Sequence, residues 1–114
     1  MKKKIFLKLF SIALVFAMLG SDVLAQSRIS FRRGRSSATV GGPIGAKGYR
    51  EYLIRGRAGQ VMTIKISSGN GAVTANAGSA SGKDFSVEMT GGDHLITVYN
   101  SGGATRYTMT VMIR

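Results

Sequence analysis

The chain contains no cysteine, a single proline and a single histidine, and only five acidic residues among its 114. Without cysteine, no disulfide can hold the fold together, and no lipid anchor of the cysteine type can form. A small domain without these supports must draw its stability from packing alone, or from packing together with oligomerisation.

The scarcity of ionisable groups argues against catalysis. Beyond residue 25 the acidic side chains are Glu51, Asp84, Glu88 and Asp93, and the one histidine is His94. Asp84 and Glu88 would share one face of a predicted strand but lie about 13 Å apart, so they are expected to be ordinary solvated charges. His94 falls in the alternation with Ile96 and Val98 and is expected at the core or its rim. A metal site would need three or four ligands, and His94 is a single one. We therefore expect neither an enzyme nor a bound metal or cofactor.

The first residues have the three-part pattern of a secretory signal. Lysines at positions 2–4 precede a nearly apolar run over residues 5–19, and Ala25 provides a small residue for cleavage. The run is shorter than the roughly 20 apolar residues that a membrane span needs. We predict a cleaved signal peptide over residues 1–25 and one exported domain over residues 26–114, in the periplasm or secreted.

Within residues 26–114 the dominant pattern is alternation of apolar and polar residues, interrupted by glycine-rich stretches. This alternation is typical of strands with one buried face, and the regular spacing of turns favours a sandwich or barrel. We predict an all-β fold, a single antiparallel β-sandwich (jelly-roll-like) of about eight short strands. The expected strands lie around residues 28–32, 38–40, 51–55, 62–66, 73–77, 85–89, 96–99 and 107–113.

Residues 72–81 form the weakest part of this pattern, because they are rich in alanine, glycine and serine. Small side chains bury little apolar area, at roughly 25 cal/mol per Å². We therefore expect this segment to be an edge strand or poorly ordered.

Basic residues outnumber acidic ones throughout the predicted domain, with 12 lysines and arginines against four carboxylates, a net charge of +8. Such a charge favours anionic partners, although it also serves solubility. On the predicted strands, Arg28 and Arg32 would face outward, as would Arg55, and adjoining faces would form a basic surface with Tyr49 nearby. An ordinary solvated face is the alternative. The residues form two groups, first Arg28, Arg32, Arg33 and Arg35, and then Lys47, Arg50, Arg55 and Arg57.

Several short motifs together resemble a known family. They are Ile29-Ser30-Phe31 with the following 34–38 segment, Ala58-Gly59-Gln60 between two alternating strands, Gly92-Asp93-His94, and the final 107–111 segment. In this order they resemble the bacterial pre-peptidase C-terminal-like β-sandwich, and within it they are similar to the periplasmic inhibitors of g-type lysozyme. Those inhibitors carry a basic loop between their last two strands, whereas the corresponding connection here spans only residues 100–105.

The resemblance implies a non-catalytic protein that blocks the cleft of g-type lysozyme with a loop. The residues expected to contact that protein partner are Lys47, Tyr49, Arg50 and Arg106, all next to predicted turns. A second hypothesis is a module that binds an anionic envelope polymer through Arg28, Arg32, Arg33 and Arg35, or else an envelope protein of another role. Nucleic acid is disfavoured, because few aromatic residues accompany the basic ones. The sequence does not fix the oligomeric state, because an exposed edge strand can pair with a second chain to form a dimer.

Overall fold

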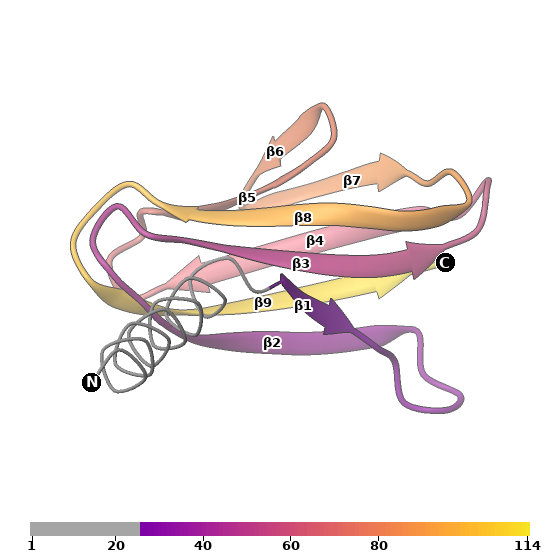
Figure 1. Ribbon diagram of the computed structural model, residues 1–114, viewed down its shortest axis with the longest axis horizontal. Helices are drawn as coiled ribbons and strands as arrows, with labels where there is room; N and C mark the ends of the chain where they lie inside the picture. Colours follow the sequence, from indigo (N-terminus) through magenta and orange to yellow (C-terminus); the bar gives the residue numbers. More distant parts are fainter. Residues whose placement is uncertain (1–25) are drawn as a thin grey trace, which may run out of the picture.

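A computed structural model describes residues 26–114, so the predicted signal peptide lies outside the described residues. Residues 26–114 form nine β-strands joined by short turns (Figure 1). The strands are β1 (Gln26–Ile29), β2 (Ser37–Ile44), β3 (Tyr49–Gly56), β4 (Val61–Ser68), β5 (Val73–Ala77), β6 (Ala80–Gly82), β7 (Asp84–Glu88), β8 (Gly92–Asn100) and β9 (Thr105–Ile113).

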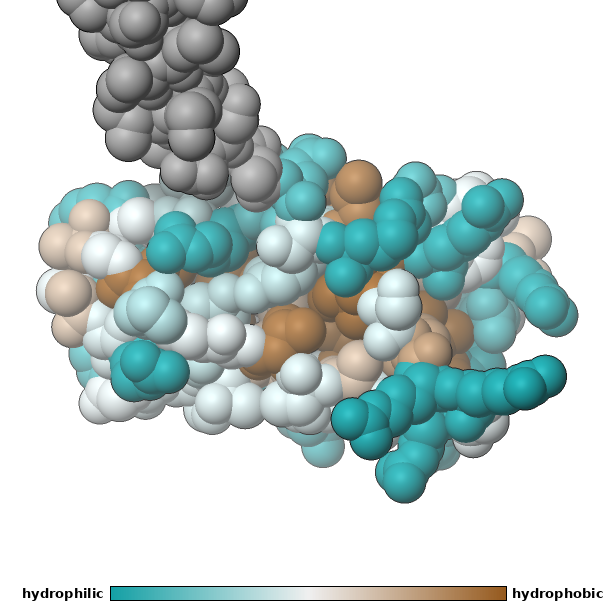
Figure 2. All heavy atoms as spheres, turned by 60° about the horizontal axis from the view of Figure 1, so that its bottom comes forward, coloured by the Kyte–Doolittle hydropathy of each residue, from teal (hydrophilic) through white to brown (hydrophobic). Residues whose placement is uncertain are grey.

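The strands make two sheets that pack face to face. One sheet has the order β1-β3-β8-β5-β6 and the other has the order β2-β9-β4-β7. Alternate residues point into the space between them, and Met62, Ile64 and Ile66 of β4 belong with Ile96 and Val98 of β8 to one buried cluster. The prediction of an all-β sandwich is confirmed. Figure 2 shows hydrophobic residues between the sheets on the side where β1 and β2 lie.

Three details differ from the sequence-based expectation. β1 pairs with β3 in parallel, so the sandwich is not wholly antiparallel. β6 lies in a glycine-rich stretch between the strands predicted around residues 73–77 and 85–89, which raises the strand number from about eight to nine among residues 26–114. The prediction for residues 72–81 was wrong for β5, which lies between β8 and β6 with Ala75 and Ala77 buried. β5 is held between β8 and β6 by pairing on both sides, and the edge of the sheet is formed by β6.

The Ala58-Gly59-Gln60 element forms the turn between β3 and β4. Gly59 has a φ of +88°, a value that L-amino acids rarely adopt, and its amide donates to the carbonyl of Met89 at 3.1 Å. The side-chain oxygen of Gln60 accepts the amide of Arg57 at 2.7 Å, and its carbonyl accepts the amide of Met89 at 2.8 Å. This turn therefore fastens the start of β4 to the connection between β7 and β8.

A pair of buried tyrosines connects the two sheets. Tyr52 of β3 and Tyr107 of β9 share a hydrogen bond between their hydroxyl groups. Burial, together with the bond to Tyr52, raises the pKa of Tyr107 above its ordinary value. A phenol in this environment stays protonated because its anion would lose solvation.

Replacing Tyr107 with phenylalanine should lower the free energy of unfolding at pH 8 by about 1–3 kcal/mol, because the hydroxyl of Tyr52 loses its partner. The folded-state pKa of Tyr107 is raised, so its contribution is complete below the unfolded pKa, which is about 10, and declines as pH rises further. The variant should therefore lose stability less steeply than the wild type above about pH 10.

Urea unfolding at pH 8 and at several values above 10 checks this expectation. The exposed Tyr99→Phe variant is the control, and its stability at pH 8 should stay within about 0.5 kcal/mol of the wild type. Parallel pH profiles for the wild type and Tyr107→Phe would contradict the assignment.

Among residues 26–114 the structure has no helix long and apolar enough to cross a membrane.

Candidate functional site

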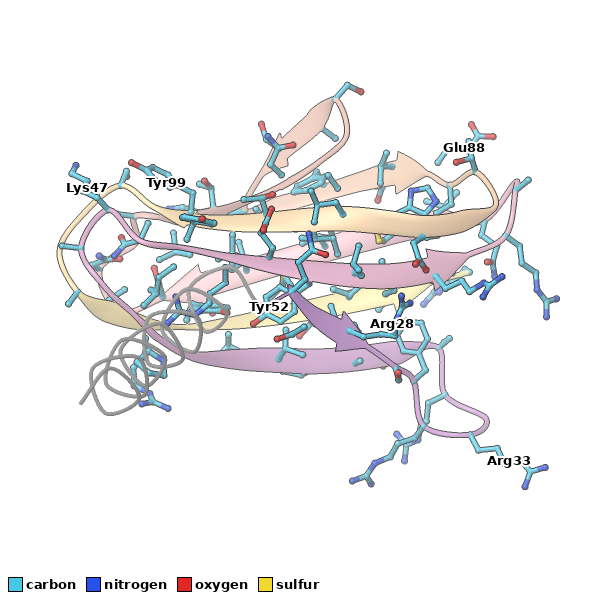
Figure 3. All side chains as sticks on the ribbon, viewed as in Figure 1. Arg28, Arg33, Lys47, Tyr52, Glu88 and Tyr99 are labelled. Atoms are coloured by element: carbon cyan, nitrogen blue, oxygen red, sulfur yellow. The ribbon has the colours of Figure 1, made fainter. Side chains whose placement is uncertain are left out.

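The two ends of the sandwich differ in chemistry. We call one the loop end, formed by the turns at residues 45–48, 69–72 and 101–104, and the other the arginine end. Figure 3 shows Lys47 and Tyr99 at the loop end. It shows Arg28, Arg33 and Glu88 toward the arginine end. The arginine end is defined by Arg28, Arg32, Arg33, Arg35, Arg55, Arg57 and Arg114.

Asn100, at the end of β8, holds the loop end together and is fully buried. Its side-chain amide donates to the carbonyl of Gly45 at 2.9 Å and to that of Gly103 at 2.8 Å. Its side-chain oxygen accepts the amide of Gly102 at 3.0 Å and the side chain of Asn70 at 3.2 Å. One side chain thus connects all three turns. Asn100 was not among the residues predicted from the sequence. Its spacing of two from Val98 and four from Ile96 places it on the buried face of the strand, and a polar residue there indicates a hydrogen-bonding role.

Asn70 extends this network into the turn between β4 and β5. Its side-chain nitrogen also donates to the carbonyl of Gly103 at 2.8 Å, and its oxygen accepts the amide of Ala72 at 2.9 Å. The backbone amide of Ser101 donates a hydrogen bond to the carbonyl of Ala72 at 3.0 Å. Because the polar groups of the turns are paired with one another, the loop end is an ordered surface.

Lys47, the first of the predicted contact residues, is at the tip of the turn between β2 and β3. It has a φ of +56°, and its amide donates to the carbonyl of Gly102 at 3.2 Å. Its ammonium group donates to the carbonyl of Ser101. Lys47 is therefore exposed but anchored to the neighbouring turn.

Arg50 spans the gap between the two sheets at this end. Its guanidinium group donates to the carbonyl of Tyr49 at 3.0 Å and to that of Pro43 at 3.2 Å, which belongs to β2 of the other sheet. The backbone position opposite Pro43 in β9 is Arg106. Arg50 thus braces the edge of the sandwich, and part of its hydrogen-bonding capacity is already used.

Tyr49 points outward from β3, directly opposite Tyr99 of β8. Their exposed fractions are 43% and 44%, which is high for aromatic side chains. Leu53 and Leu95 form a second apolar pair on the outer face of the same two strands, and the polar pair of Glu51 and Thr97 separates them from the tyrosines. Tyr99 was not among the predicted contact residues, because sequence alone did not show that it is the cross-strand neighbour of Tyr49.

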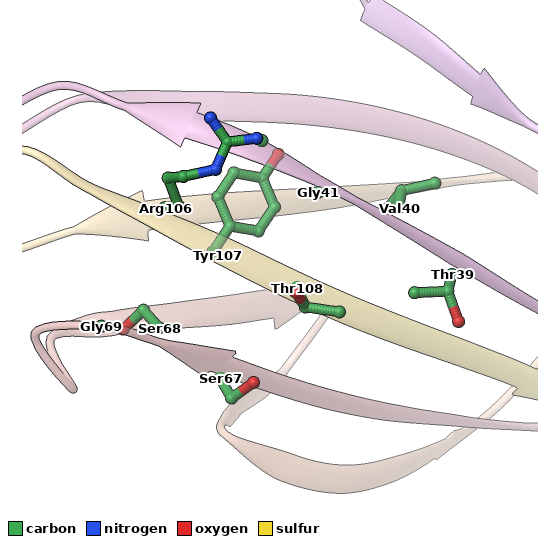
Figure 4. A pocket seen from close by; sticks show the side chains of 10 residues that line it. Thr39, Val40, Gly41, Ser67, Ser68, Gly69, Arg106, Tyr107 and Thr108 are labelled. Carbon is green, nitrogen blue, oxygen red and sulfur yellow. The ribbon is translucent and has the colours of Figure 1, made fainter.

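Arg106 lies on the outer face of the other sheet, beside a hollow of about 450 Å³ (Figure 4). Thr39, Ser67 and Thr108 line this hollow, together with the bare backbone of Gly41. A Cβ atom on Gly41 would be 2.2 Å from the carbonyl oxygen of Tyr107, so only glycine fits. The structure therefore brings Lys47, Tyr49 and Arg50 together and places Arg106 on the opposite outer face of the same end.

The basic residues are not grouped as their sequence positions suggested. β3 runs from the loop end to the arginine end, so Arg50 and Arg55 lie at opposite ends of one strand. Arg28 is opposite Leu53, so the outward faces of β1 and β3 do adjoin, but Tyr49 is not near Arg28 because it lies four residues further along β3, about 13 Å away. Arg32 also differs from the prediction, because β1 ends at Ile29 and Arg32 belongs to the following loop.

One arginine of this end is paired. The guanidinium group of Arg28 donates to both carboxylate oxygens of Asp93, at 3.0 Å and 2.8 Å, and the bond holds the pKa of Asp93 below its ordinary value. It is the one ion pair found among residues 26–114. The other arginines of this end therefore present charge to solvent.

The remaining ionisable residues give no catalytic arrangement within the described part of the chain. Asp84 and Glu88 are both exposed on β7, as expected. His94 is partly buried, and one ring nitrogen lies 2.8 Å from the carbonyl oxygen of Thr90, which agrees with a position at the rim of the core. Residues 26–114 contain no group of three or more residues suited to hold a metal ion.

Neither protein-family models nor curated proteins match the chain. Solved structures do. PliG of Aeromonas hydrophila, a periplasmic inhibitor of g-type lysozyme, shares 22% identity and a TM-score of 0.68, over 78% of this chain and 96% of that one. Salmonella Typhimurium PliG shares 20% identity and a TM-score of 0.62, over 78% and 97%. The pre-peptidase C-terminal domain of Bacillus anthracis collagenase shares 17% identity and a TM-score of 0.61, over 75% and 93%. The resemblance in fold that the sequence motifs indicated is therefore confirmed.

Proposed function

We propose that this chain is an exported, non-catalytic binding protein that inhibits a g-type lysozyme through its loop end. The observation that carries the proposal is the likeness to two PliG inhibitors over nearly their whole length, at TM-scores of 0.68 and 0.62. Export follows from the predicted signal peptide and agrees with the periplasmic location stated for those two proteins.

The chemistry of the loop end supports a protein partner. Binding energy at protein interfaces is concentrated in aromatic and arginine side chains, and Tyr49, Tyr99 and Arg50 lie together here. The turns are already fixed by Asn100, so little conformational entropy would be lost on binding. The cleft of a glycosidase contains acidic groups, to which a basic turn such as that of Lys47 is attracted.

The test measures hydrolysis of bacterial cell walls by a g-type lysozyme with increasing amounts of residues 26–114, which contain the complete sandwich. We expect a stoichiometric loss of hydrolysis that is absent with c-type and i-type enzymes. Tyr49→Ala should weaken inhibition at least tenfold, as expected for a central aromatic contact. Lys47→Gly removes the ammonium group while keeping a residue suited to φ of +56°, and should weaken inhibition severalfold.

The matched control is Val61→Ala, because Val61 is as exposed as Tyr49 but lies toward the arginine end. It should leave inhibition unchanged. Full hydrolysis in the presence of excess protein would reject the inhibitor proposal. Salt-sensitive binding to cell-wall material without inhibition would support the second hypothesis, an anionic polymer bound through Arg28, Arg32, Arg33 and Arg35.

A further inference from the structure

We propose that the arginine end docks on the phosphate headgroups of an anionic membrane surface. The first observation is the kind of cation found there. All seven basic residues of this end are arginines, whereas the three lysines among residues 26–114 lie elsewhere, at positions 47, 65 and 83. A guanidinium group binds phosphate oxygens in a bidentate manner that an ammonium group cannot reproduce. This segregation points to phosphate chemistry rather than to charge alone.

The second observation is that this charge is left unneutralised by the protein. Seven arginines face two acidic side chains at this end, Asp93 and Glu88, and Asp93 is already bound to Arg28. Arg32, Arg33 and Arg35 all belong to the exposed loop between β1 and β2. Such an excess of like charge at one end lowers stability unless an anion compensates it.

The third observation is a hollow of about 310 Å³ in the same loop. Arg32 and Arg35 line it, together with the hydroxyl-bearing residues Ser30, Ser37 and Thr39. Two guanidinium groups and several hydroxyl groups around one small space are the donors that a single phosphate group needs. The loop keeps this shape because the amide of Arg35 donates to the carbonyl of Arg32 at 2.8 Å.

The shape of the arginine end favours a flat partner over a linear one. The arginines come from the β1–β2 loop, from β1 and β3, from the β3–β4 turn and from the chain end after β9, which all terminate at the same end of the sandwich (Figure 1). Figure 2 shows hydrophilic side chains projecting from this end. Side chains that project along the strand axis contact a planar layer of phosphates, whereas a linear polymer is bound better along a groove.

This inference is independent of the proposed function, because it concerns the opposite end of the molecule. Nine-residue strands such as β8 and β9 span about 30 Å, so a protein docked by its arginines would hold the loop end about that far from the headgroups. Both ends could then be occupied together.

The test measures binding of residues 26–114 to vesicles of phosphatidylcholine alone and of phosphatidylcholine with phosphatidylglycerol, by co-sedimentation at two salt concentrations. We expect binding to the anionic vesicles only, and weaker binding at the higher salt concentration. Each arginine near an anionic surface contributes about a fivefold gain in affinity, so R33Q/R35Q should bind roughly 25-fold more weakly. The matched control K65Q/K83Q removes the same charge elsewhere and should bind less than threefold more weakly.

Three outcomes would overturn the proposal. They are the absence of binding to anionic vesicles at low salt, equal losses in R33Q/R35Q and K65Q/K83Q, and tighter binding to soluble polyphosphate than to vesicles at equal phosphate concentration. The second would show that net charge alone is responsible, and the third would assign the arginine end to a linear polymer. Circular dichroism of both double variants checks that they remain folded.

Discussion

Replacing Asn100 with alanine should lower the free energy of unfolding by about 3 kcal/mol or more and loosen the loop end. The carbonyls of Gly45 and Gly103 and the amide of Gly102 would all lose the hydrogen bond that the buried Asn100 side chain makes with them. Four hydrogen bonds of the Asn100 side chain would be lost, each contributing roughly 0.5–1.5 kcal/mol, and these contributions are not fully additive. Urea unfolding measures the total effect.

Hydrogen exchange distinguishes local loosening from general destabilisation in this variant. The amides of Lys47, Gly102 and Ser101 join the turns to one another, so they should lose more protection than amides in the middle of β4 and β9. The control is Asn76→Ala, which removes the same side chain from the exposed face of β5 and should change stability by less than about 0.5 kcal/mol. Equal effects of the two replacements would show that Asn100 does not organise the loop end.

Replacing Val111 with aspartate should abolish the cooperative fold. Val111 is fully buried in β9, opposite Ile64 of β4 and Ala38 of β2. An unpaired carboxylate there costs several kcal/mol, and a domain of this size has only about 5–10 kcal/mol of total stability. Circular dichroism during heating should show no unfolding transition, and Ile64→Asp should behave in the same way.

The adjacent Thr110→Asp is the matched control, because its side chain points to the opposite face of β9, beside Lys65. It should fold with a stability within about 1 kcal/mol of the wild type. Strand alternation has a period of two, so a one-residue error in register would reverse these results. A folded Val111→Asp beside an unfolded Thr110→Asp would identify that error.

The sequence predicted well those features that depend on local alternation. Met62, Ile64 and Ile66 are all buried while Lys65 between them is exposed, as the period-two pattern requires. The pairing of strands was harder to predict, because β1 meets β3 and β2 meets β9 across long stretches of chain. Nothing local to residues 26–29 distinguishes a parallel partner from an antiparallel one, which is why the orientation of β1 was not foreseen.

The candidate site was predicted only in part, for a related reason. Lys47, Tyr49 and Arg50 are neighbours in sequence and stay neighbours in the structure. Tyr99, however, joins Tyr49 only through the register of β3 with β8. The grouping of the arginines could not be predicted for the same reason. The direction of β3 separates Arg50 from Arg55 and brings Arg55 toward Arg28. Sequence proximity groups residues correctly within a turn but not along a strand.

The network around Asn100 also has a kinetic consequence. It joins residues 45, 70 and 103, so its contacts close only after chain segments far apart in sequence have met. Forming such non-local contacts first lowers the conformational entropy of the chain, because a long loop must close before the contacts can stabilise it. Contacts of this kind therefore slow the folding of β proteins. During folding, the loop end would therefore become competent to bind only once both sheets have assembled, and a partly folded chain would not engage a partner there.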